Sequence, residues 1–294
     1  MKNPSLGLLA VLVMLTFASG TLRADEASRG EEYFVAAESG RIKIVSFNIQ
    51  IFGTAKMARP EVAAILADIV SQADITAIQE VRSAAPDPVE AFMALLPPRY
   101  AYVLGPREGR SSSKEQYWVI YDTEKFTVLG EDTWADPDDI YERNPLAVYF
   151  QTAGQFDFIL INNHIQPGNA AAEINALPLV SDYYRALWDD GDVLIMGDFN
   201  ADGSYYDESL LADVFPEGEY RIIIPNTIDT TVAPSDNTYD RIIITGFALE
   251  DYADSFGVIR FDELYDFSQM GIIPAQVSDH YPVWAEFFID RDTD

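Results

Sequence analysis

The sequence predicts an α+β fold in which two mostly antiparallel β-sheets pack together and carry helices on their outer faces. Some ten segments are apolar, or alternate between apolar and polar residues, as strands do. Only about three segments repeat their apolar residues at helical spacing, which is too few for a strictly alternating parallel fold. The chain has 294 residues with no repeat, linker or low-complexity stretch, so a single large domain is expected.

Residues 1–24 have the pattern of an export signal. Lys2 gives a positive start, and an almost unbroken apolar run follows over residues 6–18. The run is short for a membrane-spanning helix, although an uncleaved anchor is the alternative interpretation. Export predicts a secreted or periplasmic protein with no stable membrane association once the signal is removed.

The rest of the chain divides into a lead-in and one folded domain. Residues 25–40 are polar and rich in Glu, which predicts a flexible lead-in. Regular strand and helix patterns then fill residues 41–290, and these residues are expected to form the domain.

The elements of this domain follow one another in a mixed order. The first strand begins near Ile42 and ends at Asn48. A helix starts at Pro60, a residue suited to a first helical turn. A longer helix runs from Asn169, a suitable cap residue, to Trp188, with an irregularity expected at an internal proline. The other strands are expected at residues 75–81, 101–104, 117–121, 126–129, 146–152, 156–164, 193–196, 221–224, 241–245 and 281–288.

The composition excludes several kinds of site. The chain has no cysteine, which rules out a disulfide scaffold, a thiolate metal site and a cysteine nucleophile. It has only two histidines, His164 and His280, so a cage of three histidines around a metal is excluded too. The net charge of −29 argues against general affinity for nucleic acid, because phosphate binding depends mostly on Lys and Arg.

Polar residues border the apolar strands at their ends, where ligands and catalytic groups commonly gather. Any one of them alone is more simply a turn or cap residue. Together they indicate one convergent pocket. The set consists of Asn48, Glu80, His164, Asp198, Asn200, Asp240, Asp279 and His280.

The side-chain types in this set select a reaction class. Carboxylate and amide oxygens suit Mg²⁺, Mn²⁺ or Ca²⁺ rather than zinc. A histidine beside a carboxylate transfers protons near neutral pH. Asp279 directly precedes His280 and should point to the opposite face, so another carboxylate is expected to orient that ring. Metal, histidine–carboxylate pairs and Asn donors together indicate the attack of water on a phosphodiester.

At these residues the chain resembles the endonuclease/exonuclease/phosphatase superfamily, and within it the deoxyribonuclease I branch closely. The matching stretches keep the family's order over residues 41–288. Gly-Asp-Phe-Asn at 197–200 and Ser-Asp-His-Tyr-Pro at 278–282 are moderately specific for the superfamily. Lys-Glu-Gln-Tyr at 114–117 and Ala-Glu-Ile-Asn at 172–175 favour the deoxyribonuclease branch. The resemblance implies a four-layer α/β/β/α sandwich, a monomer, and a DNA endonuclease.

The resemblance implies two acid–base pairs. His280, oriented by Asp240, would take a proton from the attacking water. His164, paired with Glu115, would give a proton to the leaving 3′-oxygen, and the products would be 5′-phosphorylated DNA fragments. Which histidine gives the proton and which takes it stays open from the residues alone. Without the resemblance, Glu115 would be interpreted as a surface strand residue.

The resemblance also implies where metal and DNA bind. Glu80 would hold Mg²⁺ or Mn²⁺, with Asn48 and Asp279 close by. Asp198, a further catalytic residue, and Asn200 would bind the phosphate or a second ion. The basic residues expected to contact DNA are Arg82, Arg110 and Arg143.

Structural calcium is implied only in part. Asp229 and Thr231 match one calcium site, but Ala233 stands at another of its ligand positions. Asp139, with the carbonyl of Tyr141, matches a second calcium site in a shortened loop. The alternative interpretation is that the acidic residues of this loop are simply exposed to solvent.

Two departures from the family weaken the expected DNA contact. Ser113 stands where the family has a Tyr that stacks on deoxyribose, and Gln50 stands where it has an Arg. Binding is therefore expected to be weak and to depend on a local basic rim around residues 107–114. The rival interpretations are a phosphoesterase of the same superfamily acting on a phospholipid or small phosphate ester, and a catalytically inactive binding module.

Overall fold

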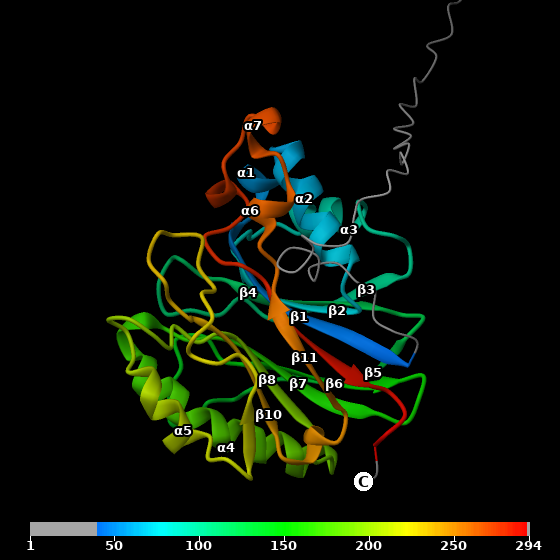
Figure 1. Ribbon diagram of the computed structural model, residues 1–294, viewed down its shortest axis with the longest axis vertical. Coiled ribbons are helices and arrows are strands. Elements are labelled where there is room, and N and C mark those ends of the chain that lie inside the picture. The colour runs from blue at the N-terminus through cyan, green and yellow to red at the C-terminus, as the bar shows by residue number, and fades with distance from the viewer. Residues whose placement is uncertain (1–39, 293–294) are drawn as a thin grey trace, which may run out of the picture. The chain divides into compact units, whose positions relative to one another are not determined.

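Two β-sheets lie face to face between two sets of helices, as the computed structural model of residues 40–292 shows (Figure 1). The predicted α+β class and the four-layer order are confirmed. The predicted export signal and nearly all of the lead-in lie outside the described residues. None of the helices within residues 40–292 has both the length and the apolar character needed to cross a membrane.

The helices include two long ones and several of a single turn. The α-helices are α1 (Thr54–Met57), α2 (Pro60–Ser71), α3 (Asp87–Met93), α4 (Ala170–Trp188), α5 (Leu211–Val214), α6 (Phe261–Leu264) and α7 (Phe267–Met270). The 3₁₀ helices are Pro167–Asn169, Glu208–Leu210, Phe247–Leu249 and Pro274–Gln276.

Sheet 1 has six strands in the order β11-β12-β1-β2-β4-β3. The central pair β1–β2 is parallel and the other four pairs are antiparallel. The strands are β1 (Arg41–Phe52), β2 (Ile75–Val81), β3 (Tyr100–Leu104), β4 (Gln116–Asp122), β11 (Tyr252–Val258) and β12 (Val283–Phe288).

Sheet 2 repeats this plan in the order β5-β6-β7-β8-β10-β9. The pair β7–β8 is parallel and the other pairs are antiparallel. The strands are β5 (Phe126–Thr133), β6 (Leu146–Thr152), β7 (Asp157–His164), β8 (Val193–Asp198), β9 (Tyr220–Ile222) and β10 (Asp240–Thr245). Each sheet thus has a parallel pair at its centre, and residues at the ends of these strands can meet.

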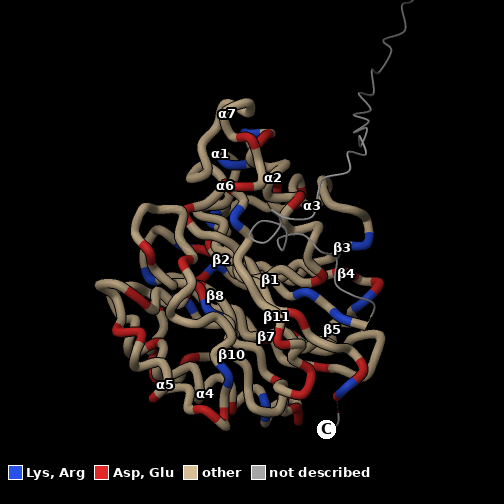
Figure 2. The backbone as a smooth tube through the Cα atoms, in the orientation of Figure 1, with Lys and Arg blue, Asp and Glu red and all other residues tan. Residues whose placement is uncertain are grey.

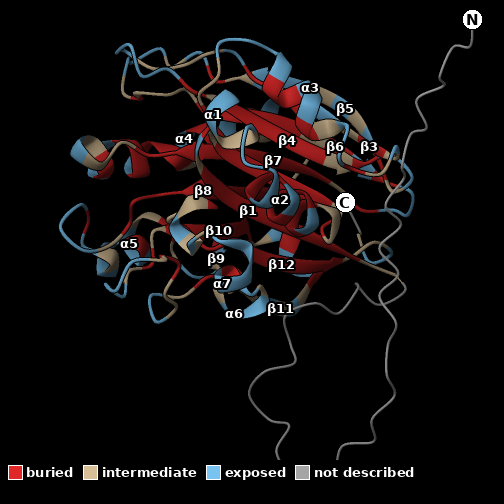
Figure 3. Ribbon diagram, turned by 90° about the horizontal axis from the view of Figure 1, so that it is seen from above, coloured by how far each residue is buried: buried red, intermediate tan, exposed pale blue. Residues whose placement is uncertain are grey.

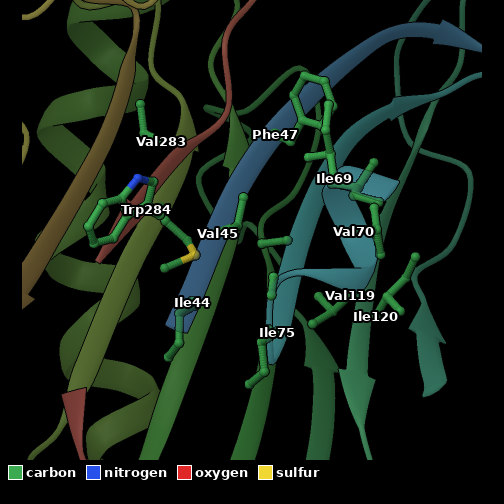
Figure 4. Packing of buried hydrophobic residues seen from close by; sticks show 14 of the residues in the cluster. Ile44, Val45, Phe47, Ile69, Val70, Ile75, Val119, Ile120, Val283 and Trp284 are labelled. Carbon is green, nitrogen blue, oxygen red and sulfur yellow. The ribbon is translucent and has the colours of Figure 1, made fainter. Parts of the chain in front are cut away.

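Alternation along the strands divides the core into layers. In β8, Leu194 and Met196 pack between the two sheets, whereas Val193 and Ile195 pack against α4 on the outer face of sheet 2. In β1, Val45 and Phe47 extend from one face and Ile44 from the other (Figure 4). The central strands are buried, whereas β5 and β11 are partly exposed, and most other exposed residues lie on loops and outer helix faces (Figure 3).

Buried polar groups join the two sheets near their centre. Gln79 in β2 donates a hydrogen bond from Nε2 to Asn162 Oδ1 in β7 at 2.7 Å, and Asn162 Nδ2 donates to the carbonyl of Ile78. The Tyr117 hydroxyl in β4 accepts from the backbone N–H of His164 at 2.9 Å. Because these groups are buried, misalignment of the layers would leave them without partners, which favours one arrangement of the sheets.

Several local predictions were wrong or incomplete. The first strand continues past its expected end at Asn48 to Phe52, and the strand expected at residues 126–129 continues to Thr133. Strand β11 was missed because it is a half-exposed edge strand with a bulge, and its pattern is weak. The short helices α1, α3, α5, α6 and α7 were missed as well. The strand expected from Tyr281 begins at Val283, because the Tyr281 N–H donates to Thr230 and Pro282 has no N–H. Asn169 begins α4, but its side chain donates to the Ile140 carbonyl instead of capping the helix.

Candidate active site

The ends of neighbouring strands in sheet 2 place three site residues in one row. His164 ends β7 and lies opposite Asp198 at the end of the parallel strand β8. Asp240 begins the antiparallel strand β10 and lies opposite Asp198 on its other side. Register alone therefore brings these three side chains to one edge of the sheet, as the strand-end pattern predicted.

Two histidine–carboxylate pairs face this row. The Nδ1 atom of His164 lies 2.6 Å from Glu115 Oε1, and the Nδ1 atom of His280 lies 2.8 Å from Asp240 Oδ2. Glu115 precedes β4 and His280 precedes β12, so each pair joins a segment that leads into sheet 1 to a strand of sheet 2. The two rings have their Nε2 atoms left for other partners.

Both Nε2 atoms approach the same oxygen. Asp198 Oδ2 lies 3.4 Å from Nε2 of His164 and 3.5 Å from Nε2 of His280. The same oxygen accepts a hydrogen bond from Asn48 Nδ2 at 3.0 Å, and that amide is also 3.3 Å from Glu80 Oε1. Residues from sheet 1 and sheet 2 therefore form one continuous polar centre around Asp198.

The charges around His280 favour its protonated form. Burial works to lower the pKa of His280, but Asp240 and Asp198 outweigh it and raise the pKa to about 10. The pKa of buried Asp240 is raised as well, because burial disfavours its charged form more than His280 stabilises it. The pair therefore holds a proton across the neutral pH range.

The surroundings of Asp198 and Glu115 favour their ionised forms. Burial works against the charged form of Asp198, yet His280, His164, the backbone N–H of Asn200 and the amide of Asn48 keep its pKa below the ordinary value. Burial likewise opposes ionisation of Glu115, but His164, Arg143 and Arg82 lower its pKa overall. The centre thus combines fixed negative charge with imidazole groups that can carry protons.

Unusual backbone conformations gather at the site. Gln50, Ile51, Glu80 and Asn200 all have positive φ angles, between 43° and 66°. At a bulge in β1 the N–H of Ile51 donates to Glu80 Oε2 at 2.9 Å, and the N–H of Gln50 donates to Asn48 Oδ1. Such backbone conformations cost free energy and persist only where surrounding contacts hold them. Here the strained segment of β1 donates hydrogen bonds that fix the side chains of Asn48 and Glu80.

Gly197 gives the first testable prediction. Its φ angle is +147°, and an added Cβ would lie 1.8 Å from the backbone oxygen of Asn163. Gly197→Ala must therefore separate β8 from β7 next to Asp198, and we expect it to lower the free energy of unfolding by about 2–4 kcal/mol and to reduce activity. Urea unfolding measures the first effect. Gly168→Ala is the control, because nothing lies within 4 Å of its added Cβ; equal stability of the two variants would contradict the prediction.

The donor set fits a hard divalent cation. Ligand atoms of Glu80, Glu115 and His164 lie within 4.8 Å of one another, and the same holds for Asp198, Asp240 and His280. Asp279 Oδ1 is buried and makes no hydrogen bond within the described part of the chain. It lies 3.9 Å from His280 Nε2, so Asp279 borders this centre. Carboxylate oxygens at this spacing are suited to Mg²⁺ or Mn²⁺.

Asn200 lies at the same edge of sheet 2 as Asp198, and it forms hydrogen bonds with both Asp198 and Ile165. Its N–H donates to Asp198 Oδ1 at 2.9 Å, and its side-chain Nδ2 donates to the Ile165 carbonyl at 2.9 Å. An amide NH₂ has two donors, so one N–H of Asn200 remains for a substrate oxygen.

The arginines predicted to contact DNA are bonded to the protein. Arg82 contacts Glu80 at 3.0 Å and donates to the Ser113 hydroxyl at 2.8 Å. Arg143 is mostly buried, where it pairs with Glu115 at 2.7 Å and donates to the carbonyl of His164. Both therefore lie at the site, where they orient the acidic residues.

Arg110 and the rim residue Arg107 are placed differently. Arg107 donates to the carbonyls of Arg82, Ser83 and Lys114. Arg110 donates to Asp139 and to the carbonyl of Tyr141. The guanidinium of Arg110 is thus bonded to a neighbouring loop, while its side chain stays 49% exposed, and its phosphate contact stays a prediction.

Two supporting residues were not predicted. Lys56 in α1 donates from Nζ to the carbonyls of Ile49 and Val277, at 2.6 and 2.7 Å, and so ties β1 to the segment before His280. Burial lowers its pKa to about 8, against the opposing effects of Asp279 and Glu80. Ser278 donates to the Asn48 carbonyl at 2.6 Å. A lone lysine resembles a surface residue, so no local signal marked Lys56, whereas Ser278 belongs to the Ser-Asp-His-Tyr-Pro stretch and only its supporting contact was not predicted.

Comparison with known proteins identifies a family and close relatives. A model of the Endonuclease/Exonuclease/phosphatase family matches residues 45–280. Deoxyribonuclease-1 of Gallus gallus is 34% identical over 261 residues, covering 82% of this chain and 90% of the relative. Deoxyribonuclease-1 of Homo sapiens is 33% identical over 257 residues, with 82% of this chain and 90% of the relative covered.

Solved structures share the fold at lower identity. The structure of D. rerio TDP2 complexed with single strand DNA product has a TM-score of 0.60 at 17% identity, covering 84% of this chain and 98% of that one. A mannosyl-6-phosphatase of Bacteroides thetaiotaomicron has a TM-score of 0.58 at 16% identity, with 84% and 99% covered. These likenesses show that the two-sheet arrangement is shared.

Proposed function

The chain belongs to the endonuclease/exonuclease/phosphatase family, and from this premise we propose that it is a divalent-metal-dependent endonuclease that hydrolyses DNA to 5′-phosphorylated fragments. The observation that carries the proposal is the approach of His164 Nε2 and His280 Nε2 to Asp198 Oδ2, at 3.4 and 3.5 Å. Two proton-transfer groups beside one carboxylate oxygen suit acid–base hydrolysis of a phosphodiester. The relatives named Deoxyribonuclease-1 support DNA as the substrate class.

Glu80, with Asn48 and Asp279 beside it, would hold the catalytic cation. A divalent ion bound there would polarise the phosphate and stabilise its developing negative charge. Asp198 and Asn200 lie nearest to the histidines, and the remaining N–H of Asn200 would donate to a phosphate oxygen. Glu115 and Asp240 would keep the two rings oriented, because each accepts from Nδ1 of its histidine.

We propose the proton transfers that the resemblance implies. His280, oriented by Asp240, would take the proton of the attacking water, and His164, paired with Glu115, would give a proton to the leaving 3′-oxygen. The raised pKa of His280 belongs to the site without its cation, whose positive charge would oppose protonation of the ring.

DNA binding by this chain would be weak and local. Acidic positions outnumber basic ones along the described chain (Figure 2), and the arginines nearest the site are paired with carboxylates. Charges more than about 8 Å from the bound phosphates are largely screened at physiological salt. Arg82 and Arg143 would supply the phosphate contacts that remain, and moderate salt would reduce the long-range repulsion.

The remaining assignments follow from the sequence pattern. We propose that residues 1–24 direct export, so that the protein acts outside the cytoplasm, secreted or periplasmic. The catalytic domain would span residues 41–290 and act as a monomer.

An activity screen tests the proposed function. Plasmid DNA, RNA, sphingomyelin and inositol phosphates are incubated with the protein in Mg²⁺, in Mn²⁺ and with EDTA. We expect metal-dependent nicking of plasmid DNA, loss of nicking in EDTA, and 5′-phosphate on the cleaved ends. The control is the His164→Ala/His280→Ala double variant, which excludes a contaminating nuclease. Metal-dependent release from a lipid or small ester, with intact plasmid, would instead support the phosphoesterase alternative.

A further inference from the structure

An arginine from elsewhere in the chain binds to each of the two loops that resemble calcium sites. The first, loop A (residues 229–237), includes Asp229 and Thr231. The second, loop B (residues 136–144), includes Asp139 and Tyr141. In both loops a guanidinium group from outside the loop is bonded to the oxygens that would bind the ion.

In loop A the arginine is Arg260, which comes from the segment before α6. Its guanidinium lies 3.3 Å from Asp229 Oδ2 and donates to the Asp229 carbonyl oxygen at 3.3 Å. It also lies over the ring of Tyr281, 4.5 Å from the centroid. Side-chain exposure is 28% for Arg260 and 20% for Asp229, so the contact is sheltered from water. Such pairs are screened less than exposed ones.

The other oxygens of loop A are also bonded within the protein. Asp229 Oδ1 accepts from the N–H and the hydroxyl of Thr231, both at 3.0 Å. The Thr231 hydroxyl is also 2.9 Å from the Ser235 carbonyl oxygen. Ala233 offers no side-chain oxygen at all. Because calcium takes six to eight oxygen ligands, this loop does not fit the ion.

In loop B the arginine is Arg110. One of its terminal nitrogens donates to Asp139 Oδ1 at 2.8 Å, to the Asp139 carbonyl at 2.7 Å, and to the Tyr141 carbonyl at 2.9 Å. Asp139 and Tyr141 are the residues that the resemblance assigned to calcium. Asp136 accepts from the N–H groups of Ile140 and Tyr141, so its carboxylate closes the loop internally.

A guanidinium group can replace a metal ion in such loops. It carries a permanent positive charge and donates several hydrogen bonds in one plane, to carboxylate and carbonyl oxygens alike. We propose that Arg260 and Arg110 take the place of the two calcium ions, so that the stability of the catalytic domain does not depend on Ca²⁺. Arg260 contributes more to the stability of the domain than Arg110 does, because the Arg110–Asp139 pair is exposed to water and screened.

Loop A also connects Arg260 to the active site. Thr231 forms a β-bridge with His280, and the Tyr281 N–H donates to the Thr230 carbonyl at 2.8 Å. The Val232 N–H donates to the Asp279 carbonyl. Arg260 therefore supports the segment that carries His280, and activity in Mg²⁺ should not require added calcium.

The test is thermal unfolding of the full chain at constant Mg²⁺, with EGTA or with added Ca²⁺. We expect the wild-type midpoint to shift by less than about 1 °C, since an ion that does not bind the folded state cannot stabilise it. Arg260→Gln is expected to lower the midpoint by about 3–8 °C. Arg221→Gln, an exposed arginine of β9, is the matched control and should leave it unchanged.

Each outcome decides the proposal. A calcium-dependent rise that Asp229→Asn or Asp139→Asn removes would overturn it for that loop. A rise that persists in both variants but disappears in Glu80→Gln reports binding at the catalytic centre, and so supports it. Equal midpoints for Arg260→Gln and Arg221→Gln would overturn it for loop A. The wild-type titration decides the question even if Arg260→Gln does not fold.

Discussion

Replacing either histidine with alanine is expected to lower the rate of plasmid nicking by about 10²–10⁴-fold, the usual contribution of a positioned acid or base. Each ring is fixed through Nδ1, by Glu115 or by Asp240, and presents Nε2 to the centre. The double variant should be little slower than the slower single variant, because the two groups act in one step. Near-normal rates in either single variant would remove that residue from the mechanism.

A substrate with sulfur in place of the leaving 3′-oxygen separates the two roles. A thiolate leaves without being protonated, so a variant that lacks only the acid should recover most of its rate on this substrate. We expect recovery for His164→Ala and none for His280→Ala, with Mn²⁺ as the cation in every arm. Recovery of His280→Ala instead would reverse the two roles, and recovery of neither would show that no histidine protonates the leaving group.

Asp198→Asn is expected to change both activity and the titration of His280. The variant keeps the shape of the side chain but removes the charge near both Nε2 atoms, and a loss of about 10²–10³-fold in rate is expected. Asp198 is also one of the main causes of the raised pKa of His280, so that pKa should fall from about 10. Proton NMR measures it directly, because the chain has only two histidines.

The same titration predicts how stability depends on pH in metal-free protein. The pKa of His280 rises from its ordinary value of 6.5 to about 10 on folding. The contribution of His280 to the free energy of unfolding is therefore fully present below pH 6.5, and it is lost as the pH rises toward 10. Urea unfolding over this range should show falling stability in the wild type and a smaller fall in Asp198→Asn. An unchanged His280 pKa in the variant would contradict this account.

The sequence was sufficient for the features that depend on local pattern. The strands carry long apolar runs, and the site residues stand at their ends, so the pattern alone could place Asp198 and His164 together. The pairing of Glu115 with His164 is different, because the two residues are 49 positions apart, one before β4 of sheet 1 and the other at the end of β7 of sheet 2. Local pattern describes Glu115 as a surface residue, and only the family resemblance suggested its partner.

The same limit applies to the arginines. A basic stretch near the site predicted a rim for DNA, since sequence shows the charge of Arg107 and Arg110 but not the oxygens they bind. The structure pairs Arg110 with loop B, which came close to it only through folding. Arg260 drew no attention at all, because a single arginine before a short helix has no distinctive pattern.

The way in which both acid–base pairs span the two sheets has a consequence for how this enzyme would fail. Glu115 and His280 belong to one layer, and their partners belong to the other, so each pair is intact only while the layers stay aligned. A slip of one layer over the other by the length of a hydrogen bond would uncouple both imidazoles together. The turnover rate therefore depends on the alignment of the two layers. Heating or packing defects should abolish activity before the domain unfolds.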